Sequence, residues 1–200
     1  MTTLKEIKKH ITISEGNRKV PFPNLSLPPI KTCKKGIPCA KDCYAMKSFT
    51  QYPSVRMAYN KNLSTLKKNK ALYFGLISTY IDIKKPSFFR WHVAGDITSR
   101  SYFRGMVGVA LNHPKSKFLA FTKRPEFVDH KNIPGNLSIV ISAWPTVNHP
   151  KTSLPIAWMQ DGTENRMDMD KCIQCPGNCD NCGACWELKR HNLDVVFDKH

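Results

Sequence analysis

The sequence has no long apolar run, no secretory signal and no internal repeat or low-complexity tract. Its longest apolar stretch, residues 71–83, is interrupted and is too short to cross a bilayer. The first ten residues, MTTLKEIKKH, are charged and lack the apolar segment of a secretory signal. We therefore expect a cytoplasmic protein with no membrane partner.

Acidic residues are scarce as well. The 200 residues include 31 Lys and Arg but only 15 Asp and Glu, which gives a formal net charge of +16. This excess predicts a polyanionic partner, either nucleic acid or a phosphate-bearing substrate such as a nucleotide. The alternative is that scattered lysines keep the protein soluble and that thiolate-bound clusters cancel several charges. No helix-turn-helix, RNP or basic-helix pattern accompanies the charge, so both interpretations stay open.

The order of the predicted elements indicates an α/β fold. With 41% hydrophobic residues, the chain is long enough for one globular core. Four prolines in residues 20–32 favour an extended segment or an edge strand, and residues 1–20 an arm or short helix. Apolar periodicity predicts helices over 55–68, 71–84 and 101–112, helical turns over 125–130, and strands over 88–93, 117–122, 136–143, 154–160 and 193–197.

Strands that alternate with helices over short connections predict βαβ units and a parallel sheet. The elements are too few for a complete eight-fold barrel of ~250 residues. We therefore expect a small, incomplete (β/α) barrel over residues 1–160, followed by a cysteine-rich segment over residues 161–200.

Three cysteines lie within eleven residues in the polar loop CKKGIPCAKDCYA: Cys33, Cys39 and Cys43. In a reducing compartment, closely spaced cysteines indicate a metal more often than disulfides. The lysines of this loop favour thiolates. Three thiolates are one short of a closed four-ligand site, so the loop either borrows a distant ligand or leaves one position open.

The other five cysteines lie together in CIQCPGNCDNCGACW: Cys172, Cys175, Cys179, Cys182 and Cys185. The last three have the C-x2-C-x2-C spacing that lets one short loop bind three corners of a [4Fe-4S] cluster, with Cys175 as the fourth ligand and Cys172 spare or exchanging with it. A zinc site on the C-x2-C pairs is the alternative. Eight cysteines divide equally well into two closed sites, or into three, four and one spare. Trp144, Trp158 and Trp186 are expected to be core or cluster-shielding side chains.

Polar side chains follow the ends of three predicted strands. In FRWHVAGD, strand alternation places Arg90 and His92 on one face, which suggests a polar cavity, and Asp96 just past the end. Lys123 and Ser142 stand at corresponding ends, where α/β folds bind ligands. Each residue alone also fits a structural role: His92 in the core, Arg90 at the surface, Asp96 as a helix cap.

These motifs together resemble a known family. CKKGIPCAKDCYA, FRWHVAGDITSRSYF, FLAFTKRPE and CPGNCDNCGACW occur in the order seen in the gene product 88 family of phage and mobile-element proteins. That family is similar in turn to proteins related to radical S-adenosylmethionine (SAM) enzymes. The resemblance spans roughly residues 20–186. It implies an incomplete barrel of radical-SAM type, in the host cytoplasm, with a [4Fe-4S] cluster on the first three cysteines and an auxiliary cluster on the second group.

The resemblance also implies cofactor-binding residues. Tyr44, next to Cys43, is similar to the aromatic residue of radical SAM loops. Gly95 and Asp96 stand where those enzymes have a Gly-Gly-Glu strand end that holds the SAM amino group. The cysteine spacing here is C-x5-C-x3-C, where radical SAM loops usually have C-x3-C-x2-C.

Two hypotheses of function follow. In the first, the protein is a minimal radical-SAM-like enzyme that acts on a nucleotide or nucleic-acid-related substrate, with Arg90, His92, Asp96, Lys123 and Ser142 lining the pocket. In the second, clusters or zinc only stabilise a binding protein that targets host protein or nucleic acid. A zinc protein that binds DNA would be colourless, with an affinity that falls steeply with salt.

Overall fold

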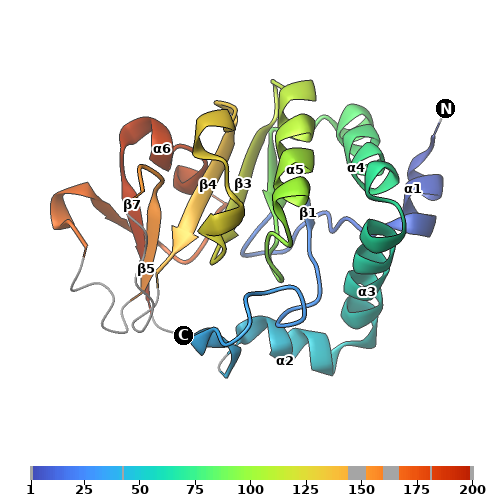
Figure 1. Cartoon of the computed structure of the whole chain (residues 1–200), viewed down its shortest axis with the longest axis horizontal. Helices are drawn as coiled ribbons and strands as arrows, with labels where there is room; N and C mark the ends of the chain where they lie inside the picture. The colour runs from blue at the N-terminus through green and yellow to red at the C-terminus, as the bar shows by residue number, and fades with distance from the viewer. Residues whose placement is uncertain (1, 42, 144–151, 160–166, 181, 199–200) are drawn as a thin grey trace.

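The computed structural model describes residues 2–41, 43–143, 152–159, 167–180 and 182–198, which form an open α/β sheet with helices (Figure 1). Within them, seven strands pair in the order β1-β2-β3-β4-β5-β7-β6, and every pairing is parallel. Their bounds are Asn24–Leu25 (β1), Phe88–Trp91 (β2), Lys117–Thr122 (β3), Leu137–Ser142 (β4), Ile156–Met159 (β5), Cys172–Gln174 (β6) and Asp194–Phe197 (β7). Because β1 and β6 are the outermost strands of this order and do not pair with each other, the sheet is not a closed barrel.

Four helices pack against one face of this sheet (Figure 1): α1 (Leu4–His10), α3 (Pro53–Lys68), α4 (Lys70–Lys84) and α5 (Arg100–Asn112). Their apolar side chains meet alternate strand residues, among them Phe89, Trp91 and Phe118, in the largest buried cluster. Two shorter helices, α2 (Tyr44–Gln51) and α6 (Leu188–His191), lie elsewhere. No helix in the described part of the chain is both long and apolar enough to span a bilayer.

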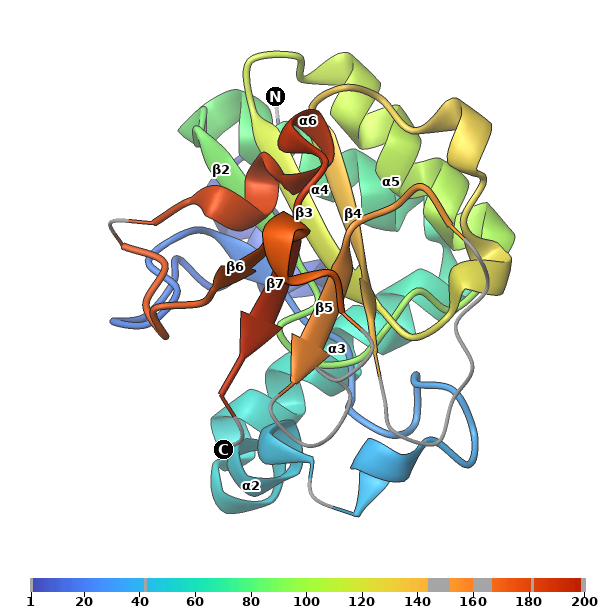
Figure 2. The ribbon, with the colours of Figure 1, turned by 90° about the vertical axis from the view of Figure 1, so that its left-hand side faces the viewer.

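The second face of the sheet is covered by the cysteine-rich segment. The strand residues between those of the first face, such as Leu119, Val140 and Val195, pack against Trp186 and Leu188. In Figure 2 this segment and α6 lie in front of the sheet. Both faces are therefore apolar, as expected for a parallel sheet buried on both sides.

The edge strand β1 positions the first cysteine loop. It pairs with β2, and the chain continues alongside: Arg90 N–H donates to Pro23 O at 3.0 Å, His92 N–H to Leu25 O at 2.8 Å, and Leu27 N–H to Ala94 O at 2.9 Å. The cysteine loop and α2 follow at the end of the molecule toward which the β5 and β7 arrowheads point in Figure 2. The loop therefore lies at the carboxyl edge of the sheet.

Most of the expected helices and strands are confirmed, including the parallel sheet and the proline-rich edge strand. The helical turns expected over 125–130 are two 3-10 turns, Pro125–Phe127 and His130–Asn132. Helix α2 and strand β6 were not predicted. The expected division of the chain at residue 160, and Trp144, lie outside the described residues. Beyond that division, β6 and β7 join the same sheet.

One expectation about a strand is wrong. β2 ends at Trp91, and His92 has a left-handed backbone with φ of +55°. This conformation breaks the strand alternation, so the side chains of Arg90 and His92 do not share a face. The cause is the packing of His92 against helix α5, which no local pattern encodes.

Candidate metal centres and the carboxyl edge of the sheet

The first cysteine group lies in a short loop that the sheet edge holds closely. Gly95, with φ of +85°, lets this loop approach: an added Cβ would lie 2.6 Å from Thr32 Oγ1 and 2.9 Å from Leu27 O. Thr32 in turn donates to Pro28 O at 2.8 Å. Because only glycine fits both the backbone angle and the close contact, Gly95 fixes Cys33 beside the end of β2.

The charges near the first group come from distant residues. Burial raises the pKa of Cys33 to about 11, with Asp96 raising it further and Lys123 lowering it. Burial also raises the pKa of Cys39, and Lys123 again opposes the shift. Lys123, at the end of β3, is therefore a cation that acts on both thiols from outside the loop. Metal binding would have to displace the thiol protons.

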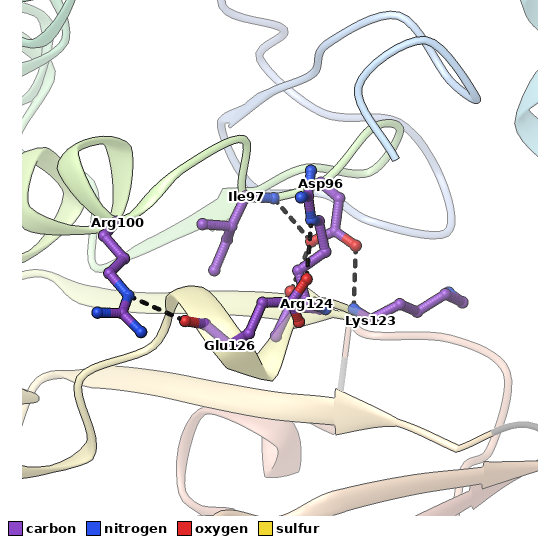
Figure 3. A network of polar contacts seen from close by, with 7 residues as sticks. Asp96, Ile97, Arg100, Lys123, Arg124 and Glu126 are labelled. Atoms are coloured by element: carbon purple, nitrogen blue, oxygen red, sulfur yellow. Dashed lines mark hydrogen bonds and ion pairs between the residues drawn. The ribbon is translucent and has the colours of Figure 1, made fainter. Parts of the chain in front are cut away.

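Asp96 joins the ends of β2 and β3 to the start of the α5 region (Figure 3). Its Oδ1 accepts from Ile97 N–H at 2.7 Å and from Thr122 Oγ1–H at 2.6 Å, and its Oδ2 accepts from Lys123 N–H at 2.9 Å. The side chain is 3% exposed, and burial raises the pKa of the carboxyl, which these donors partly offset. Asp96 is therefore a buried carboxylate that links the end of β2 to the end of β3.

A second set of contacts surrounds this link in Figure 3. Arg100 Nε donates to Glu126 O at 3.2 Å, and Arg124 Nε lies 3.4 Å from Glu126 Oε1. The guanidinium of Arg124 also lies over the Phe127 ring, 4.0 Å from its centre. The 3-10 turn after β3 is thus tied to the start of α5, and the backbone at Lys123 is held in place.

His92 points into the helix layer. Its Nε2 lies 2.8 Å from Tyr102 Oη, and Tyr102 Oη lies 3.1 Å from Tyr73 Oη, all three side chains being buried. Burial, together with the charge of Arg90, lowers the pKa of His92 to about 3. His92 is therefore neutral at physiological pH, and its second nitrogen, Nδ1, is buried with no partner in the described structure.

Arg90 points to the opposite face, toward the second cysteine group. Its guanidinium lies 5.1 Å from the centre of the Phe121 ring. Burial raises the pKa of Cys179, and Arg90 is the largest opposing influence. Arg90 also opposes the raised pKa of Cys175 and of Cys185. Its Nε is buried and has no hydrogen-bond partner among the described atoms. No carboxylate therefore neutralises the guanidinium at this nitrogen.

Tyr44 connects the two sides of the carboxyl edge. Its hydroxyl donates to Val93 O, so the start of α2 touches the end of β2. Desolvation of the phenol hydroxyl raises the pKa of Tyr44, and the charge of Arg90 opposes this shift. The residue as a whole is 65% exposed. Ser142 ends β4 on the face that Val140 and Arg90 share, and it is partly exposed.

The second cysteine group is anchored from three directions. Cys175 N–H donates to Val196 O at 2.8 Å, Cys179 N–H donates to Lys19 O at 3.0 Å, and Ser138 Oγ–H donates to Cys185 O at 2.8 Å. Four of its thiols influence one another: burial raises the pKa of Cys185 to about 12, and the neighbouring thiols that raise it further are Cys175, Cys179 and Cys182.

Cys172 stands apart from these four. It begins β6, packs with Trp158 and Val196, and the only charge that adds to the effect of burial on its raised pKa is Asp194. The structure thus separates the eight cysteines into three at the sheet edge, four over the sheet face and one in β6. The sequence had favoured Cys175 as the fourth ligand and had left Cys172 as spare or exchanging with it.

The donor chemistry of both groups fits an iron–sulfur cluster, because each offers thiols, the soft ligands that clusters and Zn²⁺ share. Across the described ranges, no three Cys, His, Asp or Glu side chains are close enough together to hold a metal ion. To hold a cluster, the thiols of Cys33, Cys39 and Cys43, and likewise those of Cys175, Cys179, Cys182 and Cys185, would therefore have to come closer together than they lie in the described structure.

Aromatic side chains shield the second group. The rings of Phe22, Phe88 and Trp186 form a triangle with centroid distances of 5.0 to 5.1 Å, and Trp186 is buried. Sequence reasoning identified Trp186 but missed Phe22, Thr122 and Tyr102. No local signal marks these three, because they matter only through contacts with residues that lie far away in the chain.

Comparison with known proteins identifies a family. The sequence profile of a family described as gene product 88 matches residues 2–188, nearly the whole chain. No curated protein matches, and no solved structure matches.

Proposed function

The chain belongs to the gene product 88 family, and from this premise we propose that it is an iron–sulfur protein with a minimal radical-SAM-like active site. One cluster would bind to Cys33, Cys39 and Cys43, and a second to Cys175, Cys179, Cys182 and Cys185. The observation that carries the proposal is the division of the cysteines: three at the carboxyl edge of a parallel sheet, with no fourth cysteine beside them, and four on its face.

The position of the first group supports an open site. In α/β folds, ligands bind beyond the carboxyl ends of the strands, where this loop lies. Cys33, Cys39 and Cys43 would hold a four-iron cluster there and leave room for a small molecule beside it. When bound, such a cluster would supply one-electron reduction of SAM.

The residues of the chain would prepare this site in distinct ways. Lys123 provides a positive charge beside Cys33 and Cys39, which favours their thiolates and any anionic group of a ligand. Asp96 holds the ends of β2 and β3 in register through its three hydrogen bonds. Tyr44, in contact with Val93 O and largely exposed, can offer its ring to a bound ligand.

Arg90 would serve the second cluster. Four thiolates carry a large negative charge, and a guanidinium in a partly buried position offsets it. Since Arg90 also acts on Tyr44 of the first site, one cation lies within electrostatic reach of both groups. The excess of basic residues favours a nucleotide or nucleic-acid-related substrate.

A non-catalytic binding protein is the second candidate function. The observation that favours it is the placement of two expected pocket residues: the oxygens of Asp96 accept three protein donors, and His92 points into the helix layer. In this case the clusters, or zinc, would only hold the fold together.

The deciding experiment is metal and sulfide analysis of protein purified without oxygen, with EPR of the reduced protein before and after SAM is added. We expect about eight irons per chain, since two four-iron clusters are proposed, and a signal that SAM perturbs. Cys39→Ser should remove the SAM-sensitive signal, while Cys182→Ser should remove only the other. Two clusters indifferent to SAM would support the binding protein, and zinc without sulfide would overturn the iron–sulfur proposal.

A further inference from the structure

We propose that helix α2 and the first half of helix α3 form a surface for single-stranded nucleic acid. We refer to residues 44–60 as the α2–α3 overhang. The inference rests on the proposed function, because it names the class of substrate that would reach the first cysteine group. Binding of a strand to this surface can be measured without turnover.

The overhang contributes little to the core. Helix α2 buries only Ala45, and the buried residues of α3 are all in its second half: Asn62, Leu63 and Leu66. In Figure 1, α2 lies below the sheet, away from the layer formed by α4 and α5. The two helices hold each other through Phe49 and Tyr59, whose rings stack with centroids 6.1 Å apart. Helices in proteins gain most of their stability from packing, so this arrangement leaves faces for a partner.

The charge of this region has one sign. The overhang contains no Asp or Glu and two basic residues, Lys47 and Arg56. The absence of acidic residues extends to residue 81, and this adjoining stretch adds four lysines: Lys61, Lys67, Lys68 and Lys70. Neither α2 nor α3 has an acidic side chain in its first turn. Elsewhere some basic residues form ion pairs with carboxylates, as Lys171 does with Asp168, and their charge is neutralised within the protein. Solubility alone does not require a region without acidic residues.

The contacts of these cations leave their charge intact. Arg56 Nη1 donates to Thr50 O at 3.3 Å, and Lys61 Nζ donates to Lys8 O at 3.0 Å. Both acceptors are neutral backbone carbonyls. Such bonds orient the side chains and do not cancel their charge, so the surface attracts a polyanion.

Exposed aromatic and apolar side chains lie among the cations, and they favour one class of polyanion, a single-stranded nucleic acid. Tyr52 exposes 51% of its surface and Met57 exposes 70%. The bases of a single strand can stack on an exposed ring, and this contact tolerates any sequence. In a duplex the bases are already stacked on one another, so Tyr52 would gain no such contact. The combination of rings and unneutralised cations therefore favours a single strand.

The surface is continuous with the first cysteine group. Cys43 is the N-cap of α2, and Tyr44 touches Val93 at the end of β2. A strand bound along α2 would therefore lead to the carboxyl edge of the sheet. This continuity gives the overhang a role that an isolated basic patch would lack.

The test measures binding of fluorescently labelled single-stranded RNA and DNA to the full-length, anaerobically purified protein over a range of salt. In Lys47→Ala/Arg56→Ala, the slope of log affinity against log salt should become less negative by about 1.4, at roughly 0.7 per phosphate contact, which corresponds to about 25-fold weaker binding at 0.1 M salt. The matched control is Lys189→Ala/Arg190→Ala on α6, which lies at the opposite end of the molecule in both views.

Tyr52 separates stacking from charge. Tyr52→Ala should weaken binding by roughly 5- to 150-fold with an unchanged salt slope, since stacking of one base accounts for that range. Tyr52→Phe should bind as the unaltered protein does. Because the Tyr52 side chain is exposed, these variants should keep their unfolding temperature and their iron and sulfide content.

Several outcomes would overturn the proposal: equal losses in the overhang and α6 variants, duplex binding as tight as that of the single strand, or no effect of Tyr52→Ala. Binding to phosphatidylserine vesicles but not to oligonucleotides would assign the surface to a membrane instead. The iron analysis and the SAM response are measured on the same preparations. A missing SAM response with intact strand binding removes the enzyme proposal alone, and the reverse result removes the surface alone.

Discussion

Replacing Asp96 with asparagine tests whether this residue holds the strand ends together or exists to bind a ligand. The substitution preserves size and removes the charge. Asparagine can keep the two bonds at Oδ1, from Ile97 and Thr122, but its amide then faces the Lys123 N–H, which bonds Oδ2 at 2.9 Å. A donor would meet a donor in a site that is 3% exposed.

The magnitude follows from this mismatch. A hydrogen bond to a charged group contributes about 1.5–3 kcal/mol, and a buried donor left unpaired costs about 1–3 kcal/mol. These terms overlap, and removing a buried charge returns part of the loss, so we expect Asp96→Asn to lower the free energy of unfolding by about 3 kcal/mol. For a chain of this length that is a fall in unfolding temperature of roughly 6–12 °C.

The assay is urea unfolding followed by circular dichroism, at equal iron content and without SAM. The control is Asp82→Asn, whose exposed carboxylate lies 3.5 Å from His113 and should change stability by less than about 1 kcal/mol. An Asp96→Asn protein that is as stable as the unaltered one, but no longer shows a SAM-perturbed EPR signal, would refute the structural reasoning and make Asp96 a ligand-binding residue.

Three further predictions concern pH, backbone strain and metal content. The pKa of His92 falls from 6.5 in the unfolded chain to about 3 in the folded protein. As the pH falls below 6.5, the unfolded chain therefore takes up a proton that the folded protein does not, and the free energy of unfolding decreases. This loss should be about 2 kcal/mol by pH 5, and His92→Asn, which tolerates the left-handed backbone, should remove it from urea titrations; an unchanged pH slope would show that His92 is not the cause. Gly95→Ala should lower the free energy of unfolding by about 2–4 kcal/mol. Gly36 also has a positive φ, but no atom lies within 4 Å of an added Cβ, so Gly36→Ala should lower it by only about 1 kcal/mol. Equal effects of the two substitutions would contradict the close contact between Gly95 and the first cysteine loop. Cys172→Ser should keep the full iron and sulfide content, whereas Cys182→Ser should lose about half, and a loss in the first variant would place Cys172 among the ligands.

The parts of the fold that could be predicted are those with local causes. The run FLAFT is apolar and aromatic, and LSIVIS is apolar and β-branched, so both favour the strands that they form, β3 and β4. Pro86 and the polar residues before it end α4 where the pattern does. Helix α2 escaped prediction because it is only eight residues long and buries a single residue, Ala45.

The candidate site was predictable in composition and less so in geometry. Strand ends correctly suggested that Asp96 and Lys123 would be neighbours, since parallel strands end at one edge. The reversal of His92 could not be foreseen, because its positive φ is set by the contact with Tyr102 on another element. Likewise, the separation of Cys172 from Cys175 depends on the pairing of β6 with β7, which is a nonlocal contact.

The position of β7 in the sheet has a consequence for how the protein matures in the cell. This strand follows β6 in the sequence but lies between β5 and β6, so β6 has no neighbour until β7 has been synthesised. The four cysteines over the sheet face belong to the connection between these two strands. During translation they therefore leave the ribosome as an exposed thiol-rich loop. If this group binds the proposed cluster, its delivery and the completion of the sheet would coincide late in synthesis, and a failure to complete the sheet would leave an unpaired strand edge open to aggregation.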